Sequence, residues 1–223
     1  YLKLKNVKMI VFDMAGTVIN DNGIVYQTLY TTMKDFGLRV PKQDKEFWYG
    51  GDKKEILDYY LCENQVMRRP IQKELHNKFF TNLKEQYFES DQIQLIHPKV
   101  PELLTDIRKK DILVTLNTGY NNDVQTNIIK KLHMTDYISD FVSGEDVSKG
   151  RPYPYMIYKL MERNNIVTPT QVVKIGDTQK DIFEGLNAKC FSSIGVLSGY
   201  GNKTTLRSAD DILDSVMDLD KNK

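Results

Sequence analysis

The sequence predicts an α/β fold in which a parallel sheet forms the core and a small helical cap domain is inserted after the first strand. Beyond position 98, short apolar runs alternate with helical segments, and this alternation is typical of a parallel sheet covered on both faces. Between 23 and 90 the apolar spacing is helical only. We therefore expect a core made of residues 1–19 and 97–223 and a cap made of residues 20–96.

The first strand and the cap helices follow from the spacing of apolar side chains. Residues 8–12 are an apolar run that predicts a buried strand. A first cap helix is expected over 25–36, where apolar residues recur every three or four positions and Gly37 follows as a stop. Two further cap helices, rich in Glu, Lys, Leu and Tyr, are expected over 46–61 and 71–88.

The remaining elements belong to the core. Apolar faces at helical spacing and short apolar runs predict its helices and strands. In order, these are a helix over 100–107, a strand over 112–116, a helix over 124–132, a strand at 141–142, a helix over 156–161, strands over 172–175 and 194–197, and a helix over 210–219.

Composition limits the partners. The 223 residues carry 31 Lys and Arg against 30 Asp and Glu, a net charge of +1, which argues against nucleic-acid binding by bulk charge. No apolar run is long enough to span a bilayer, and no signal-peptide pattern is visible. We expect a cytoplasmic monomer or homodimer with no nucleic-acid and no membrane partner.

Polar residues follow the predicted strands, where open α/β sheets place their sites. Asp13 and Asp177 each come directly after a strand or its last glycine, and two carboxylates suit Mg²⁺. Thr118 and the Gly119 amide can donate to phosphate oxygens, and Arg151 can clamp them. Asp13 can attack phosphorus as a covalent nucleophile. Each residue alone could be a helix cap or a turn residue, but four such features at strand ends favour a site.

Four segments, KMIVFDMAGT, LNTG, KGRPYPYMI and VVKIGDTQKD, occur in the order of the motifs of the haloacid dehalogenase superfamily, which the chain resembles over nearly its whole length. The stretches DMAGT, GRPYP and GDTQKDIFEGLNA resemble phosphonoacetaldehyde hydrolase and the phosphonatase-like hydrolases. The resemblance implies a Rossmann-like core and one Mg²⁺ held by Asp13, Asp177 and the carbonyl of Ala15. Asp181, one helical turn beyond Asp177, is expected to support the metal through water or to pair with Lys149.

The remaining expected site residues contact substrate. They are Gly16, Thr17, Gly50 and Gly119. Ala15 stands where superfamily phosphatases usually have an Asp that protonates the leaving oxygen, a step worth about 10²–10⁴-fold in rate. The leaving group must therefore be activated in another way.

In the phosphonatases, a cap lysine forms a Schiff base with an aldehyde substrate. The spacing Gly50-x-x-Lys53 resembles that motif, and Lys54 could be the neighbouring cation that depresses the pKa of Lys53. Two positions depart from phosphonoacetaldehyde hydrolase, since Gly23 stands in place of a Cys and Ile56 in place of a His.

The resemblance implies an Mg²⁺-dependent hydrolase with an aspartyl-phosphate intermediate, acting on a small phosphonate or organic phosphate metabolite. One alternative is a phosphomonoesterase or phosphoanhydride hydrolase, similar to phosphoglycolate phosphatase. A phosphomutase is disfavoured, because Ala15 cannot shuttle the proton that such a reaction needs. A non-catalytic binding protein on the same scaffold is the other alternative; the joint presence of Asp13, Thr118, Arg151 and Asp177 argues against it.

Overall fold

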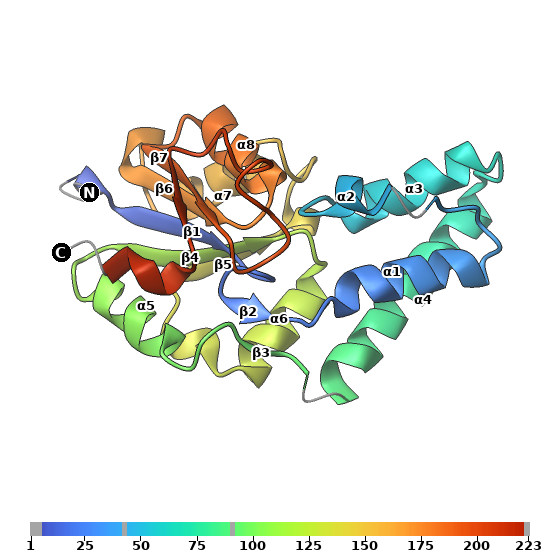
Figure 1. The fold of residues 1–223 in the computed structure, drawn as a ribbon, viewed down its shortest axis with the longest axis horizontal. Helices are drawn as coiled ribbons and strands as arrows, with labels where there is room; N and C mark the ends of the chain where they lie inside the picture. Colours follow the sequence, from blue (N-terminus) through green and yellow to red (C-terminus); the bar gives the residue numbers. More distant parts are fainter. Residues whose placement is uncertain (1–5, 42–43, 90–91, 221–223) are drawn as a thin grey trace.

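A six-stranded parallel sheet is the centre of the computed structural model, which describes residues 6–41, 44–89 and 92–220. Its strand order is β5-β4-β1-β6-β7-β8. Each neighbouring pair runs parallel, which confirms the predicted parallel sheet. The strands are β1 Met9–Asp13, β4 Leu113–Thr118, β5 Asp140–Ser143, β6 Val172–Gly176, β7 Ser192–Val196 and β8 Asp211–Leu213. Figure 1 shows β1 in the middle of the sheet.

Helices cover both faces of this sheet. They are α5 Val100–Arg108, α6 Asn122–Lys131, α7 Tyr155–Arg163 and α8 Gln179–Ala188. Successive side chains of a strand point to opposite faces, so β1 contributes to two apolar cores. Ile10 and Phe12 belong to the core that also holds side chains of α5 and α6, whereas Met9 and Val11 pack with those of α7.

Between residue 24 and residue 89, the described part of the chain forms helices and no strand, as predicted. We call α1 Ile24–Asp35, α2 Lys45–Trp48, α3 Lys53–Glu63 and α4 Arg69–Glu89 the cap helices. They lie to one side of the sheet, with α1 packed along α4 (Figure 1). No helix in the described ranges is both long and apolar enough to cross a membrane.

The single helix expected over 46–61 is wrong: the structure has two helices, α2 and α3, joined by a short loop. Gly50 in that loop has a φ of +70°, a left-handed conformation that only glycine adopts readily. Asp52 then begins α3, because its carboxylate accepts hydrogen bonds from the amides of Lys54 and Glu55, at 2.8 and 3.0 Å.

The helix expected over 210–219 is also wrong. Asp211–Leu213 forms β8, which pairs with β7 and completes the sheet edge. A short 3₁₀ helix, Val216–Asp220, follows it. Ser215 begins this turn, because its Oγ accepts from the amide of Met217 at 3.2 Å.

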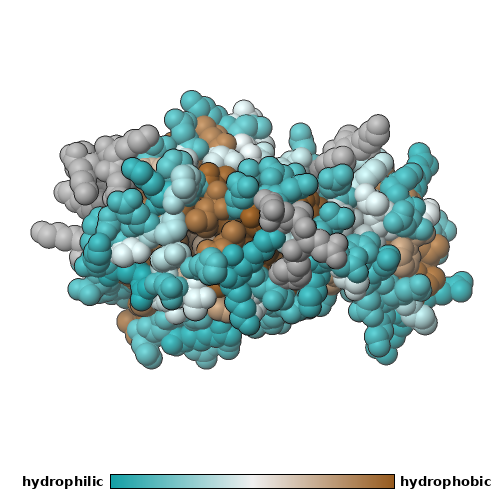
Figure 2. Space-filling model, turned by 90° about the horizontal axis from the view of Figure 1, so that it is seen from below, coloured by the Kyte–Doolittle hydropathy of each residue, from teal (hydrophilic) through white to brown (hydrophobic). Residues whose placement is uncertain are grey.

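Two short strands, β2 Ile19–Asn20 and β3 Gln94–Leu95, pair antiparallel where the chain enters and leaves the cap helices. The sequence pattern did not indicate them. The expected domain boundaries fall at this two-stranded ribbon, and the division into cap and core stays a prediction. Figure 2 shows a face that is mostly hydrophilic, with apolar side chains gathered near its middle.

Candidate active site

Three strands bring polar residues to one edge of the sheet. Asp13 is the last residue of β1, Thr118 is the last of β4, and Asp177 follows β6 directly. Asp13 stands beside Asn117 in the register of β1 and β4. The Oγ1 of Thr118 accepts from the amide of Tyr120 at 3.3 Å, so the hydroxyl proton of Thr118 remains available as a donor.

Three buried carboxylates could hold a metal at this edge. One oxygen each from Asp13, Asp177 and Asp181 lie within 4.8 Å of one another. Asp177 Oδ2 accepts from the amide of Tyr200 at 2.7 Å, whereas Asp177 Oδ1 is buried and has no hydrogen-bond partner among the described residues. A buried oxygen without a partner suits a hard cation such as Mg²⁺. These carboxylate oxygens therefore fit the expected Mg²⁺. Ala15, whose carbonyl is the third expected ligand, lines the same small cavity as Asp13 and Asp177.

The charges of the buried groups at this edge also favour a bound divalent cation. The buried groups in mutual contact are Asp13, Asp177, Asp181, Glu184, Arg151 and Lys174. Four carboxylates against two cations leave two negative charges, which one divalent cation balances. Burial raises the pKa of Asp177 well above its usual range, and the nearby charge of Asp13 adds to the effect. Ionising this cluster without a cation is therefore costly.

Arg151 organises the carboxylates. Its guanidinium contacts Asp13 Oδ1 at 2.7 Å, Asp181 Oδ1 at 3.0 Å and Glu184 Oε2 at 3.2 Å, and the arginine is only 4% exposed. The structure thus places Arg151 against the nucleophile candidate. Its expected clamp on phosphate oxygens stays a prediction.

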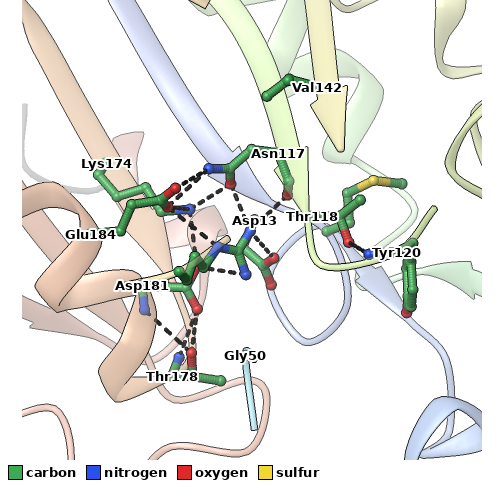
Figure 3. Close-up of polar contacts among 12 residues, drawn as sticks. Asp13, Gly50, Asn117, Thr118, Tyr120, Val142, Lys174, Thr178, Asp181 and Glu184 are labelled. Atoms are coloured by element: carbon green, nitrogen blue, oxygen red, sulfur yellow. Dashed lines mark hydrogen bonds and ion pairs between the residues drawn. The ribbon is translucent and has the colours of Figure 1, made fainter. Parts of the chain in front are cut away.

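Sequence reasoning missed a group of polar residues beside Asp13, namely Asn117, Lys174 and Glu184 (Figure 3). Lys174 is fully buried, and its Nζ contacts Asn117 Oδ1 at 2.7 Å, Asp181 Oδ1 at 3.0 Å and Glu184 Oε2 at 3.3 Å. Asn117 Nδ2 donates to Glu184 at 2.9 Å. The signal that could have revealed them is a lysine inside the apolar strand sequence VVKIG.

The expected partner of Asp181 is corrected by these contacts. Asp181 pairs with Lys174 and Arg151, not with Lys149, whose Nζ lies 4.7 Å from the ring centroid of Tyr153. Burial alone would raise the pKa of Asp181, but the two cations hold it below its usual range. Asp181 therefore stays ionised beside the metal-ligand candidates.

Gly16 packs against Asp177, and Thr17 follows it in the chain. Gly16 has a φ of +85°, and a Cβ there would stand 2.4 Å from Asp177 Oδ2. Any other residue at position 16 would therefore clash with Asp177. Thr17 is buried, and its Oγ1 has no hydrogen-bond partner among the described residues. Neither residue lines the cavity described below, and their contact with substrate stays a prediction.

The loop between α2 and α3 reaches this edge from the cap. A Cβ on Gly50 would lie 2.1 Å from Thr178 Oγ1, and a Cβ on Gly119 would lie 2.8 Å from the carbonyl oxygen of Gly51. Glycine is therefore required on both sides of this contact. The close approach positions Lys53, the first residue of α3, at the site.

Lys53 is 4% exposed, and its Nζ donates to the carbonyl of Gly51 at 2.6 Å. Burial lowers the pKa of Lys53 to about 8; Asp52 opposes this shift, whereas the charges of Lys180 and Arg151 add to it. The cation expected at Lys54 is thus supplied by other residues. Lys54 pairs with Glu145 instead.

A small cavity of about 20 Å³ lies between the sheet edge and the cap helices, which is room for about one water molecule. Its lining combines residues of both parts: Asp13, Ala15, Val25, Tyr26, Gly50, Lys53, Thr118, Gly119, Tyr120, Arg151, Asp177, Thr178 and Tyr200. The predicted nucleophile and the predicted cap lysine therefore line the same cavity.

Known proteins resemble the chain over most of its length. The family model described as haloacid dehalogenase-like hydrolase matches residues 10–194. Phosphoglycolate phosphatase of Aliivibrio fischeri is 21% identical over 200 residues, which are 89% of this chain and 87% of that protein. Phosphonoacetaldehyde hydrolase of Bacillus thuringiensis strain Al Hakam is 33% identical over 128 residues, which are 53% of this chain and 48% of that protein.

Solved structures share the fold. A phosphonoacetaldehyde hydrolase-like protein from Oleispira antarctica superimposes with a TM-score of 0.81 at 21% identity, over 97% of this chain and 91% of that one. β-Phosphoglucomutase from Clostridium difficile gives a TM-score of 0.81 at 20% identity, over 96% and 93%. These relatives act on different substrates by name, so the likeness fixes the architecture and leaves the reaction to the site.

Proposed function

Because the chain belongs to the haloacid dehalogenase-like hydrolases, we propose that it hydrolyses a small phosphonate or organic phosphate through an aspartyl-phosphate on Asp13. One observation carries this proposal. Asp13 and the buried Lys53 line the same cavity, while Ala15 provides no acid there. This combination supports a reaction in which the leaving group is activated by the lysine.

In the proposed first step, a carboxylate oxygen of Asp13 attacks phosphorus, and the bond from phosphorus to the leaving group breaks. Arg151 holds Asp13 Oδ1 and leaves the second oxygen free of this ion pair. The Thr118 hydroxyl donates to a phosphoryl oxygen. A Mg²⁺ held by Asp13, Asp177 and the Ala15 carbonyl would neutralise charge on the phosphoryl group. Water then hydrolyses the aspartyl-phosphate and releases phosphate.

For an aldehyde phosphonate, the neutral amine of Lys53 adds to the aldehyde carbon, and water is lost as a protonated imine forms. The electron pair of the breaking carbon–phosphorus bond then moves into the imine and gives an enamine, which is hydrolysed back to the free lysine and an aldehyde. The depressed pKa supports this role. With a pKa of about 8, roughly a tenth of Lys53 is neutral at pH 7, against fewer than one in a thousand for an ordinary lysine.

The second candidate function is hydrolysis of a phosphate ester or anhydride with a good leaving group. Phosphoglycolate phosphatase covers most of the chain at 21% identity, and Gly23 and Ile56 depart from the phosphonoacetaldehyde hydrolase pattern. In this case Lys53 supplies positive charge only. Ala15→Asp should then raise activity on esters with poor leaving groups, because it restores an acid.

Borohydride trapping separates the two candidates. With phosphonoacetaldehyde and Mg²⁺, borohydride should inactivate the enzyme and add the mass of the reduced two-carbon product to Lys53. Lys53→Arg should be inactive, since a guanidinium cannot form the imine. For an ester substrate, no adduct should form, and Lys53→Arg should keep a good part of the rate. Absence of Mg²⁺-dependent turnover of any small phosphonate, phosphate ester or anhydride would contradict the proposed function.

The cavity also supports a moving cap. A space of about 20 Å³ holds no phosphonate, so substrate entry requires the cap to open. We propose that residues 20–96 move as one cap about the β2–β3 ribbon and exclude water when closed.

A further inference from the structure

Three tyrosines line the cavity, namely Tyr26 of α1, Tyr120 after β4 and Tyr200 after β7. Two of them use their hydroxyl protons within the protein. Tyr200 donates to Asp21 Oδ1 at 3.4 Å. Tyr87 donates to Asp21 Oδ2 at 3.0 Å, so the proton in the 2.8 Å contact between the hydroxyls of Tyr87 and Tyr120 comes from Tyr120.

Tyr26 differs from these two. Its Oη accepts a hydrogen bond from the amide of Gly50 at 2.8 Å. A backbone N–H can only donate, so this contact leaves the tyrosine proton unused. Across the described ranges, no acceptor in the protein receives that proton. The cavity therefore contains a donor that the fold itself does not satisfy.

The position of this donor is fixed by its neighbours. The ring of Tyr26 makes edge contacts with Tyr49 and Tyr200, at centroid distances of 5.0 and 4.8 Å. Lys53 Nζ lies 5.0 Å from the centroid of the same ring. Tyr26 and Lys53 thus both come from the cap side of the cavity, opposite Asp13 and Thr118 on the sheet edge.

Building on the proposed function, we propose that Tyr26 binds the substrate and that its hydroxyl donates a hydrogen bond to an oxygen on the organic part. In the proposed mechanism Thr118 already donates to the phosphoryl group. Tyr26 lies beside Lys53, so its hydroxyl is positioned to donate to an oxygen on the carbon chain. The substrate class is then a phosphonate or phosphate whose short carbon chain carries a carbonyl or carboxylate oxygen.

The role is recognition and not acid catalysis. Burial raises the pKa of Tyr26 well above its ordinary value. A phenol with so high a pKa keeps its proton at neutral pH and is a poor general acid. Tyr26 therefore does not replace the acid that is missing at Ala15, and it acts as a neutral hydrogen-bond donor.

A matched pair of ligands tests the proposal in a binding experiment. The affinities of 2-oxopropylphosphonate and propylphosphonate, which differ by one carbonyl oxygen, are measured by calorimetry with Mg²⁺. The wild type should prefer the oxo compound, and Tyr26→Phe should reduce this preference about five- to tenfold. Tyr49→Phe is the control, because Tyr49 belongs to the same aromatic cluster but does not line the cavity. It should keep the preference.

Each other outcome has a defined meaning. If Tyr26→Phe weakens both ligands by the same factor, Tyr26 is only structural and the proposal fails; it also fails if Tyr49→Phe loses the preference equally. Equal binding of both compounds to the wild type, or binding of neither, overturns this inference alone; the proposed function fails only if the turnover assay described above finds no Mg²⁺-dependent hydrolysis. Should Tyr26→Phe not fold, replacement of Tyr26 by 3-fluorotyrosine decides, since this stronger donor should increase the preference and an unchanged preference overturns the proposal.

Discussion

Asp13 is the residue on which the proposed chemistry depends. Asp13→Asn should lower kcat/KM by roughly a thousandfold or more, because an amide is not a nucleophile. The fold should persist, since asparagine has the same shape and can still accept from Arg151. Assays with an aryl phosphate and near-ultraviolet circular dichroism check the two expectations. Residual activity within tenfold of the wild type would exclude the covalent mechanism.

Lys53 gives a prediction about pH. Its pKa is lowered to about 8, chiefly by burial, and only the neutral amine attacks an aldehyde. The rate of borohydride inactivation with phosphonoacetaldehyde should therefore rise about tenfold per pH unit below 8 and level off above it. Lys54→Met is the control, because Lys54 pairs with Glu145 and is partly exposed; it should leave the profile unchanged. A rate that keeps rising to pH 10 would contradict the burial of Lys53.

The limits of sequence reasoning are visible among single residues. Asp13, Thr118 and Asp177 could be placed at one edge because the carboxyl ends of parallel strands meet there. The pairing of Lys174 with Glu184 could not be predicted. Lys174 lies in a strand and Glu184 in a helix, and the spacing of residues in the sequence does not show which way their side chains point. The expected pairing of Asp181 with Lys149 was wrong for the same reason, since Asp181 contacts Lys174 and Arg151 instead.

At the scale of elements, the break between α2 and α3 carries a prediction. Gly50→Ala places a Cβ 2.1 Å from Thr178 Oγ1 in a left-handed backbone, so the cap loop cannot dock and kcat/KM should fall by about tenfold or more. Gly37→Ala is a matched control. It has a φ of +71°, but a Cβ there has nothing within 4 Å.

Both substitutions should cost about 1 kcal/mol through the left-handed conformation, which melting curves measure. Only Gly50→Ala should lose activity. Equal losses of activity would mean that backbone strain, and not docking of the loop, explains the effect.

The two errors among the elements have one origin. Residues 46–61 and 210–219 contain apolar side chains at spacings that suit a helix. This local pattern carries no information about contacts with residues distant in the sequence, which can favour another structure. Gly50 is held by its approach to Thr178, and Asp211–Leu213 is held by β7. Partners distant in the sequence decide both cases.

At the scale of the whole molecule, the parallel sheet and the helical insertion were predictable, because alternation and helical spacing extend over long segments. The small cavity between the sheet edge and the cap helices was not predictable. Its walls come together where the loop at Gly50 and Gly51 meets Gly119 and Thr178, and these contacts depend on how the cap helices sit on the sheet. Sequence alone therefore named most of the residues that line the cavity, without showing how small the space between them is.

The stability of the whole molecule should depend on the excess negative charge of the carboxylate cluster. The pKa of Asp177 is raised in the folded state by burial and by Asp13. A raised pKa means that ionisation destabilises the fold, and this loss develops as the pH rises from the ordinary range of aspartate through the raised value. Asp177→Asn cannot ionise, so without Mg²⁺ its melting temperature at pH 7 should exceed that of the wild type.

Mg²⁺ should reverse that order. At a hundred times its dissociation constant, a cation stabilises the fold by about 2.7 kcal/mol, which is a rise of about 5–10 °C for a chain of this size. The wild type should show this rise, and Asp177→Asn should not. Asp123→Asn, which alters an exposed carboxylate paired with Lys84, should respond to Mg²⁺ as the wild type does. If metal-free Asp177→Asn is less stable than the wild type at pH 7, ionisation of Asp177 does not destabilise the fold. If Asp177→Asn responds to Mg²⁺ as strongly as the wild type, Asp177 is not the metal ligand that its buried, unpartnered Oδ1 indicates.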